Sequence, residues 1–77
     1  MNTASPNMIQ SHVIDAYRQV FPDEAVNTDS DFFDLGGDSL SVVALCALLE
    51  KKLGQEVHPS LVIYFPTVEA LAKELSS

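Results

Sequence analysis

The 77-residue chain has 11 acidic residues against 4 Lys and Arg, a formal net charge of -7 at pH 7. This balance argues against a nucleic-acid-binding protein, which needs basic side chains to neutralise phosphates, and the length allows one small domain with a single core. The single cysteine, Cys46, cannot form an intramolecular disulfide, and no Cys/His cluster has zinc-ligand spacing, so helix packing must stabilise the fold alone.

The first predicted helix begins near Ser5, a favourable N-cap residue, with Pro6 at the first helical position, where its missing N–H costs little. Phe21-Pro22 ends it. Between these limits, four apolar residues recur at spacings of four, four and three and predict one buried stripe: Ile9, Val13, Tyr17 and Val20.

A long connection from Pro22 to Asp38 is rich in Asp, Asn, Thr, Ser and Gly, and its length in so small a domain indicates a functional or internally packed loop. We expect Val26, Phe32 and Leu35 to attach this loop to the core.

The second predicted helix runs from Ser39 to about Leu53. Asp38 is placed to cap its N-terminus and Gly54 its C-terminus, while Lys51 and Lys52 complement the helix dipole in the last turn.

After Gly54, the run from Leu61 to Phe65 favours a short helix or an irregular turn. Thr67 is placed to cap a last helix, with Glu69 in its first turn. One face of that helix is apolar: Val68, Leu71, Ala72 and Leu75. The chain therefore predicts an all-α fold, a small antiparallel four-helix bundle with three main helices, one short helix and a long loop between the first and second.

The second helix has two apolar faces, because no charged residue occurs between Ser39 and Leu49. One stripe should face the core: Val42, Leu45, Cys46, Leu49 and Leu53. The other side has an apolar strip that the bundle has nothing to bury: Leu40, Val43, Ala44 and Ala47. Such a strip commonly marks a protein contact surface, whereas the alternative is a central helix buried on all sides.

The ten residues from Asp31 to Leu40, with the sequence DFFDLGGDSL, place one serine at a glycine-containing junction between loop and helix. Gly36 and Gly37 permit unusual backbone angles and close approach by another protein, and a phosphate on Ser39 would lie at a helix N-terminus. His12 and His58 lie in other segments, so no local general base activates the serine. The site is suited to being modified, and we expect no catalytic residue and no metal ligand.

This stretch closely resembles the phosphopantetheine attachment signature of carrier proteins, above all the peptidyl carrier proteins of nonribosomal peptide synthesis. The resemblance implies that a separate phosphopantetheinyl transferase, using magnesium, attaches 4′-phosphopantetheine from coenzyme A to Ser39. The thiol of that group then carries an aminoacyl or acyl thioester. The resemblance further implies that Gly37 and Asp38 belong to the cofactor-binding site, with Asp38 near the transferase's metal, and that Leu40 is a hydrophobic contact.

The resemblance extends to Gly54 and to the segment from Phe65 to Val68, and so covers nearly the whole chain. Gly37, the Phe32-Phe33 pair and the uncharged second helix favour the peptidyl branch over fatty-acid carriers. Asp38 stands where many peptidyl carriers have histidine, so polyketide-type and aryl carriers remain open. The partners implied are the transferase, an adenylation or other loading enzyme, and downstream condensing or tailoring enzymes, with Leu40, Val43, Ala44 and Ala47 as contact residues.

Two other interpretations fail. The string from Gly37 to Leu40 is also the signature of a family of serine esterases, but those need a larger α/β fold and a downstream Asp/His pair. The run from Asp29 to Asp31 is similar to the start of a calcium loop, but Phe33, Asp34 and Leu40 replace a ligand, the glycine and the bidentate Glu. A helical interaction module with an unmodified serine is the remaining rival.

We therefore expect residues 1–77 to form one carrier domain, monomeric and freestanding, with excision from a larger synthetase as the alternative. The chain has no run of roughly 18 apolar residues that could span a membrane. Its first residues also lack the basic and apolar parts of a signal peptide. These features predict a cytoplasmic protein.

Overall fold

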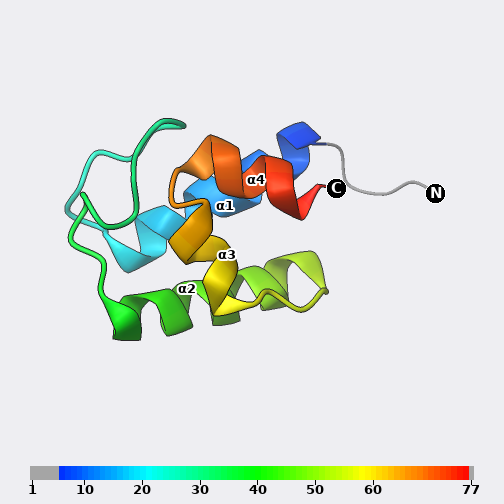
Figure 1. Cartoon of the computed structure of the whole chain (residues 1–77). Helices are drawn as coiled ribbons and strands as arrows, with labels where there is room; N and C mark the ends of the chain where they lie inside the picture. Colours follow the sequence, from blue (N-terminus) through cyan, green and yellow to red (C-terminus); the bar gives the residue numbers. More distant parts are fainter. Residues whose placement is uncertain (1–5, 77) are drawn as a thin grey trace.

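The computed structural model describes residues 6–76, and its four helices are arranged around one core (Figure 1). They are α1 (Pro6–Val20), α2 (Ser39–Leu53), α3 (Pro59–Tyr64) and α4 (Val68–Leu75). The predicted all-α fold is confirmed, and so are the limits of the second helix. The expected N-cap, Ser5, lies outside the described residues. Within residues 6–76, no helix is both long and apolar enough to cross a membrane.

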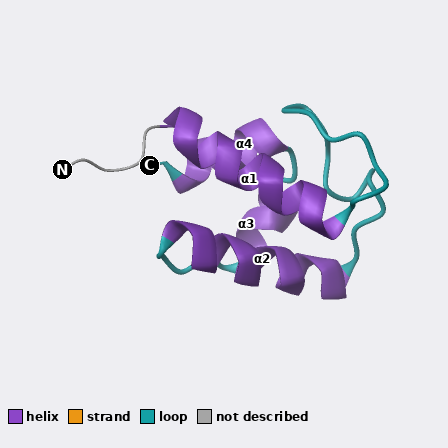
Figure 2. Cartoon of the chain, turned by 180° about the vertical axis from the view of Figure 1, so that it is seen from behind, coloured by secondary structure: helices purple, strands orange, loops and turns teal. Residues whose placement is uncertain are grey.

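Helix α1 packs against both α2 and α4, and α3 contacts α2 and α4. In Figure 1, α1 runs antiparallel to each of its two long neighbours, so α2 and α4 run in the same direction. This parallel relation arises because α3 intervenes between them, while the long loop joins α1 to α2 at one end of the bundle (Figure 2).

Caps at the helix ends follow the local sequence. Gly54 adopts a left-handed conformation with φ 68°, and its N–H donates to the carbonyl of Glu50, which ends α2. The Thr67 hydroxyl accepts from the N–H of Ala70, as predicted. The short helix begins at Pro59, two residues before the predicted run, because the His58 side chain caps it by accepting from the N–H of Ser60.

The core draws on all four helices and the long loop. The α1 stripe is confirmed for Ile9, Val13 and Tyr17, whereas Val20 is only partly buried at its edge. Val26 and Phe32 are buried from the loop, with Leu35 partly buried, as expected. All four predicted apolar positions of α4 are also buried: Val68, Leu71, Ala72 and Leu75.

Backbone hydrogen bonds attach the long loop to the start of α4. The N–H of Phe32 donates to the carbonyl of Pro66 at 2.9 Å, and the N–H of Glu69 donates to the carbonyl of Thr28 at 2.9 Å. An isolated antiparallel bridge joins Asp31 to Thr67 between these bonds. The loop that leads into α2 is therefore held in place by a segment far away in the sequence.

Candidate functional site

Ser39 is the first residue of α2, and its side chain is exposed. Across residues 6–76, no hydrogen bond involves its hydroxyl. The neighbouring Ser41 differs, because both its N–H and its hydroxyl donate to Asp38 Oδ1 at 2.9 Å. Of the two serines in this turn, only Ser39 presents an uncommitted hydroxyl.

Asp38 is the N-cap of α2, with the extended backbone typical of that position, φ -137° and ψ -172°. The hydrogen bonds from the N–H and hydroxyl of Ser41 lower the pKa of the Asp38 carboxyl below its ordinary value. Its Oδ1 is directed at Ser41, so the structure gives this carboxylate a capping role and not the place of a base for Ser39. The predicted cap is confirmed.

The two glycines before Asp38 are required for different reasons. Gly36 has φ 107°, which disfavours any residue with a Cβ. At Gly37, an added Cβ would overlap the ring of Phe32 and would lie 2.8 Å from its carbonyl oxygen. The group that approaches Gly37 closely is therefore Phe32 of the same chain, whereas the sequence alone suggested a partner protein.

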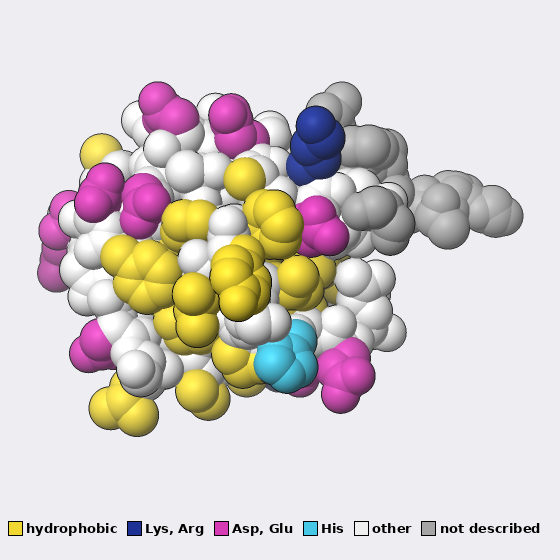
Figure 3. Space-filling model, in the orientation of Figure 1, with side chains coloured by type: hydrophobic (Ala, Val, Ile, Leu, Met, Phe, Trp, Pro, Cys, Tyr) yellow, Lys and Arg dark blue, Asp and Glu magenta, His cyan; other side chains and the backbone are white. Residues whose placement is uncertain are grey.

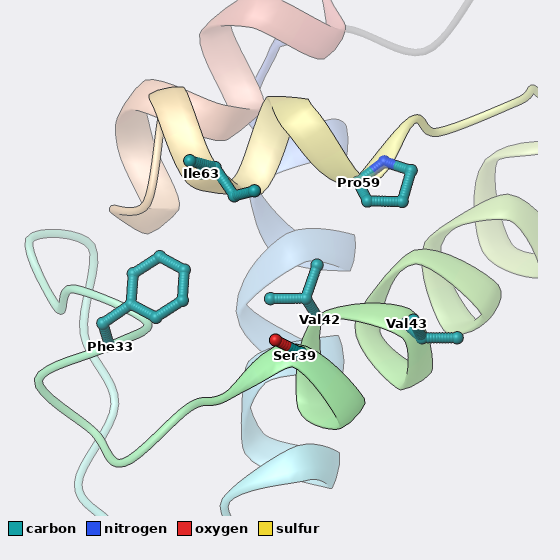
Figure 4. Close-up of a pocket in the computed structure, with 6 residues that line it drawn as sticks. All are labelled: Phe33, Ser39, Val42, Val43, Pro59 and Ile63. Atoms are coloured by element: carbon teal, nitrogen blue, oxygen red, sulfur yellow. The ribbon is translucent and has the colours of Figure 1, made fainter.

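A hollow of about 250 Å³ opens beside Ser39 between the loop, α2 and α3. In Figure 4, Phe33 from the loop and Ile63 from α3 face the start of α2 across it. The hollow is mostly apolar: Phe33, Ser39, Val42, Val43, Pro59 and Ile63 line it. Ser39 is the polar member of this set, at the edge of a surface that favours apolar groups.

The exposed apolar strip of α2 is confirmed as exposed, with Leu40 at 82% and Val43 at 59%, and with Ala44 and Ala47 also open to solvent. The opposite face is buried at Val42, Leu45, Cys46 and Leu49, and Leu53 is partly buried. Helix α2 is therefore not the fully buried central helix of the alternative interpretation.

Three further exposed apolar residues were not predicted as site residues: Phe33, Ile63 and Tyr64. Two of them, Phe33 and Ile63, line the hollow together with Val43 of the strip. A six-residue helix can turn only part of its surface to the core, and in α3 Val62 is its fully buried member, which leaves Ile63 and Tyr64 outward. The apolar residues from Leu61 to Phe65 are visible in the sequence. Which of them face outward can be read only after the segment is known to be helical. Figure 3 shows apolar side chains gathered over α3, with acidic side chains around their margin.

Other reactive side chains are engaged or lie elsewhere. The ring of His58 accepts from the N–H of Ser60 and contacts its hydroxyl at 2.9 Å, and His12 belongs to α1. Burial and the nearby Glu50 raise the pKa of the Cys46 thiol, which lies on the core side of α2. In the described part of the chain, no group of three or more His, Cys, Asp or Glu side chains could hold a metal ion.

The arrangement is suited to holding a phosphodiester. Ser39 stands at the N-terminus of a 15-residue helix, where the helix dipole stabilises negative charge. A phosphate esterified to its exposed hydroxyl would lie at that end, and an attached chain could extend from the surface without displacing the core.

Comparison with known proteins agrees with this chemistry. A family model described as "Phosphopantetheine attachment site" matches residues 12–75. The chain is 34% identical over 73 residues to tyrocidine synthase 3 of Brevibacillus parabrevis, an alignment that covers 95% of this chain and 1% of that relative. The chain thus spans only a small part of the length of this relative.

Two solved structures share the fold. A structure described as a "Non Ribosomal PCP domain" is 29% identical, with a TM-score of 0.76 over 94% of this chain and 90% of that chain. A chain in the structure of the phosphopantetheine transferase Sfp in complex with coenzyme A and a peptidyl carrier protein is 23% identical, with a TM-score of 0.82 over 97% of both chains.

Proposed function

The chain belongs to the phosphopantetheine attachment site family, and from that premise we propose that Ser39 carries the 4′-phosphopantetheine group. The chain is a carrier protein of the type found in nonribosomal peptide and polyketide synthesis. When bound, the prosthetic group supplies a terminal thiol that holds cargo as a thioester. Residues 1–77 form one carrier domain in this proposal.

The observation that supports Ser39 most strongly is its free hydroxyl at the start of α2. Ser41 donates its hydroxyl to Asp38, and the hydroxyl of Ser60 contacts the ring of His58. Modification of either would first require that contact to be broken. Ser39 requires no such change.

The protein itself performs no catalysis in this proposal, because Ser39 has no hydrogen-bonded base to activate its hydroxyl. A separate phosphopantetheinyl transferase therefore supplies the base and the metal. Asp38 keeps its capping role and contributes negative charge near the attachment point. The carboxylate is ionised at neutral pH, where an aspartate of ordinary pKa is also charged, and the hydrogen bonds from Ser41 lower its pKa further.

The exposed apolar strip is proposed as the contact surface for partner enzymes. Leu40 is next to Ser39 and is 82% exposed, so an enzyme that reaches Ser39 also meets this side chain. Val43, Ala44 and Ala47 continue the same face along α2. A partner that covers the strip removes apolar surface from water, which favours association.

The cargo is proposed to be an amino or aryl acid loaded by an adenylation enzyme, followed by transfer to condensing or tailoring enzymes. The uncharged strip supports this choice, because it offers an adenylation enzyme apolar contact and no acidic recognition residues along the first turns of α2. Loading by a malonyl-type transferase is the outcome that would favour the polyketide alternative.

The experiment is an intact-mass measurement on apo-protein treated with coenzyme A, magnesium and a promiscuous phosphopantetheinyl transferase. We expect the mass of one phosphopantetheine to be added, and Ser39→Ala to abolish the addition while its helical circular dichroism is retained. Ser41→Ala is the matched control and should still be modified. Addition to the Ser39→Ala protein would overturn the assignment, and an unmodified wild-type protein would favour the interaction-module alternative.

A further inference from the structure

We propose that Tyr17 is a positioning residue for the modification of Ser39, acting through the carbonyl of Pro66 and the side chain and backbone of Phe32. The proposal rests on the proposed function of Ser39 and adds a residue from α1 that no sequence motif connects with it. Tyr17 is fully buried, and its hydroxyl donates to the Pro66 carbonyl oxygen at 2.5 Å across 49 positions of sequence.

The first step of the connection is a shared acceptor. The N–H of Phe32 donates at 2.9 Å to the same Pro66 carbonyl that accepts from Tyr17. The rings of Tyr17 and Phe32 also meet edge to face, with centroids 5.3 Å apart and planes at 80°. Tyr17 therefore holds Phe32 through its hydroxyl, by way of Pro66, and through its ring.

The second step joins Phe32 to the residues before Ser39. The N–H of Gly37 donates to the Phe32 carbonyl at 3.1 Å, and the Phe32 ring occupies the space where a side chain at position 37 would lie. Gly37 is thus fixed by Phe32 from two sides. Asp38 and Ser39 follow Gly37 directly in the chain. The position of Phe32 therefore determines where the backbone enters the attachment site.

Phe33 extends the effect to the hollow beside Ser39. Its ring meets that of Phe32 with centroids 5.5 Å apart, and its N–H donates to Asp31 Oδ1 at 2.8 Å. Phe33 lines the hollow together with Ser39. The loop that a transferase must cover is therefore ordered in advance, and a loosened loop would have to be ordered at the moment of docking.

Tyr17→Phe isolates the hydroxyl, because the ring and its packing on Phe32 are retained. Loss of the bond should leave the loop ordered only part of the time, which raises the KM for the carrier in inverse proportion to the fraction of molecules whose loop remains ordered. We expect the KM of the transferase for Tyr17→Phe to rise by about threefold or more, with kcat changed by less than about twofold. Amide exchange at Gly37 should accelerate by at least the same factor, because it follows the open fraction of the loop, which is small in the wild-type protein.

The control is a variant at Leu75, a core residue and the last residue of α4. The long loop is hydrogen-bonded to the start of α4, at the opposite end of that helix. Leu75→Val or Leu75→Ala is chosen to match Tyr17→Phe in the free energy of unfolding. If the matched Leu75 variant raises KM equally, Tyr17 is only a structural residue and the proposal is wrong. Unchanged KM or unchanged Gly37 exchange in Tyr17→Phe would overturn it as well.

A double-mutant cycle tests the route through Phe32. Gly37→Ala displaces the Phe32 ring. If both variants act through Phe32, the change in the logarithm of KM for the double variant should be smaller than the sum of the changes for Gly37→Ala and Tyr17→Phe. Additive effects would exclude this route. Amide exchange does not depend on modification, so faster exchange at Gly37 in a protein that the transferase never modifies would retain the structural connection and reject only the proposed function.

Discussion

Val42 and Val43 are adjacent in α2, yet the first is 5% exposed and the second 59% exposed. The same contrast runs along the helix, with a buried face that holds the fold and an exposed apolar strip that begins beside Ser39. Apolar residues thus occupy two different environments on one helix. Hydrophobicity alone does not separate these environments, but position on the helix does.

Aspartate introduced at each of the two valines should give the largest difference in the free energy of unfolding between the two faces. Val42→Asp places an unpaired charge in the core and should lower the free energy of unfolding by more than about 4 kcal/mol. Val43→Asp should change it by less than about 0.5 kcal/mol, because the new carboxylate remains in water. Urea unfolding followed by circular dichroism measures both, and equal losses would contradict the two-face description.

Leu49→Ala tests the buried face without adding charge. Leu49 is fully buried, so the truncation removes apolar contacts and leaves a cavity, with an expected loss of about 2–5 kcal/mol in the free energy of unfolding. Ala47→Ser, on the exposed strip of the same helix, is the matched control and should be nearly neutral. A stable Leu49→Ala protein would mean that α2 does not contribute to the core as described.

Loading tests the exposed strip. Val43→Asp and Leu40→Ala should fold normally but raise the KM of an adenylation enzyme for the holo-protein by about tenfold, since about 1.4 kcal/mol of lost apolar contact has that effect. Gln19→Glu adds the same charge as Val43→Asp on the exposed side of α1 and should leave loading unchanged. Equal KM values for all three variants would remove the strip from the interface.

The smallest expected effect concerns salt. If the strip makes a mainly apolar contact, loading should vary by less than about threefold as the ionic strength rises to the physiological value of about 0.15 M. A steep fall in loading over that range would indicate charge pairing instead. The acidic side chains around the apolar side chains over α3 in Figure 3 would then be part of the interface, and the peptidyl assignment would be weakened.

Much of α2 could be predicted because its signals are local. Asp38 and Gly54 cap the helix at the predicted ends, and the spacing of Val42, Leu45 and Leu49 identifies the buried face. Each signal depends on residues within one or two helical turns. The same holds for Thr67, whose hydroxyl caps α4.

The surroundings of Ser39 could not be predicted in the same way, because they depend on contacts between distant segments. The Tyr17 hydroxyl and the Pro66 carbonyl meet across 49 positions, and nothing in the local sequence of either residue indicates the bond. The exposure of Ile63 also required the structure, because the sequence did not decide between a short helix and an irregular turn for its segment. The hollow beside Ser39 arises only when these segments meet.

The most direct test of the account is mass spectrometry of the protein produced together with its transferase and loading enzyme. Peptide mapping should locate a phosphopantetheine thioester of an amino or aryl acid on the peptide that contains Ser39, and release by mild hydroxylamine should leave the holo-form. An unmodified Ser39 under these conditions, or cargo attached to any other residue, would contradict it.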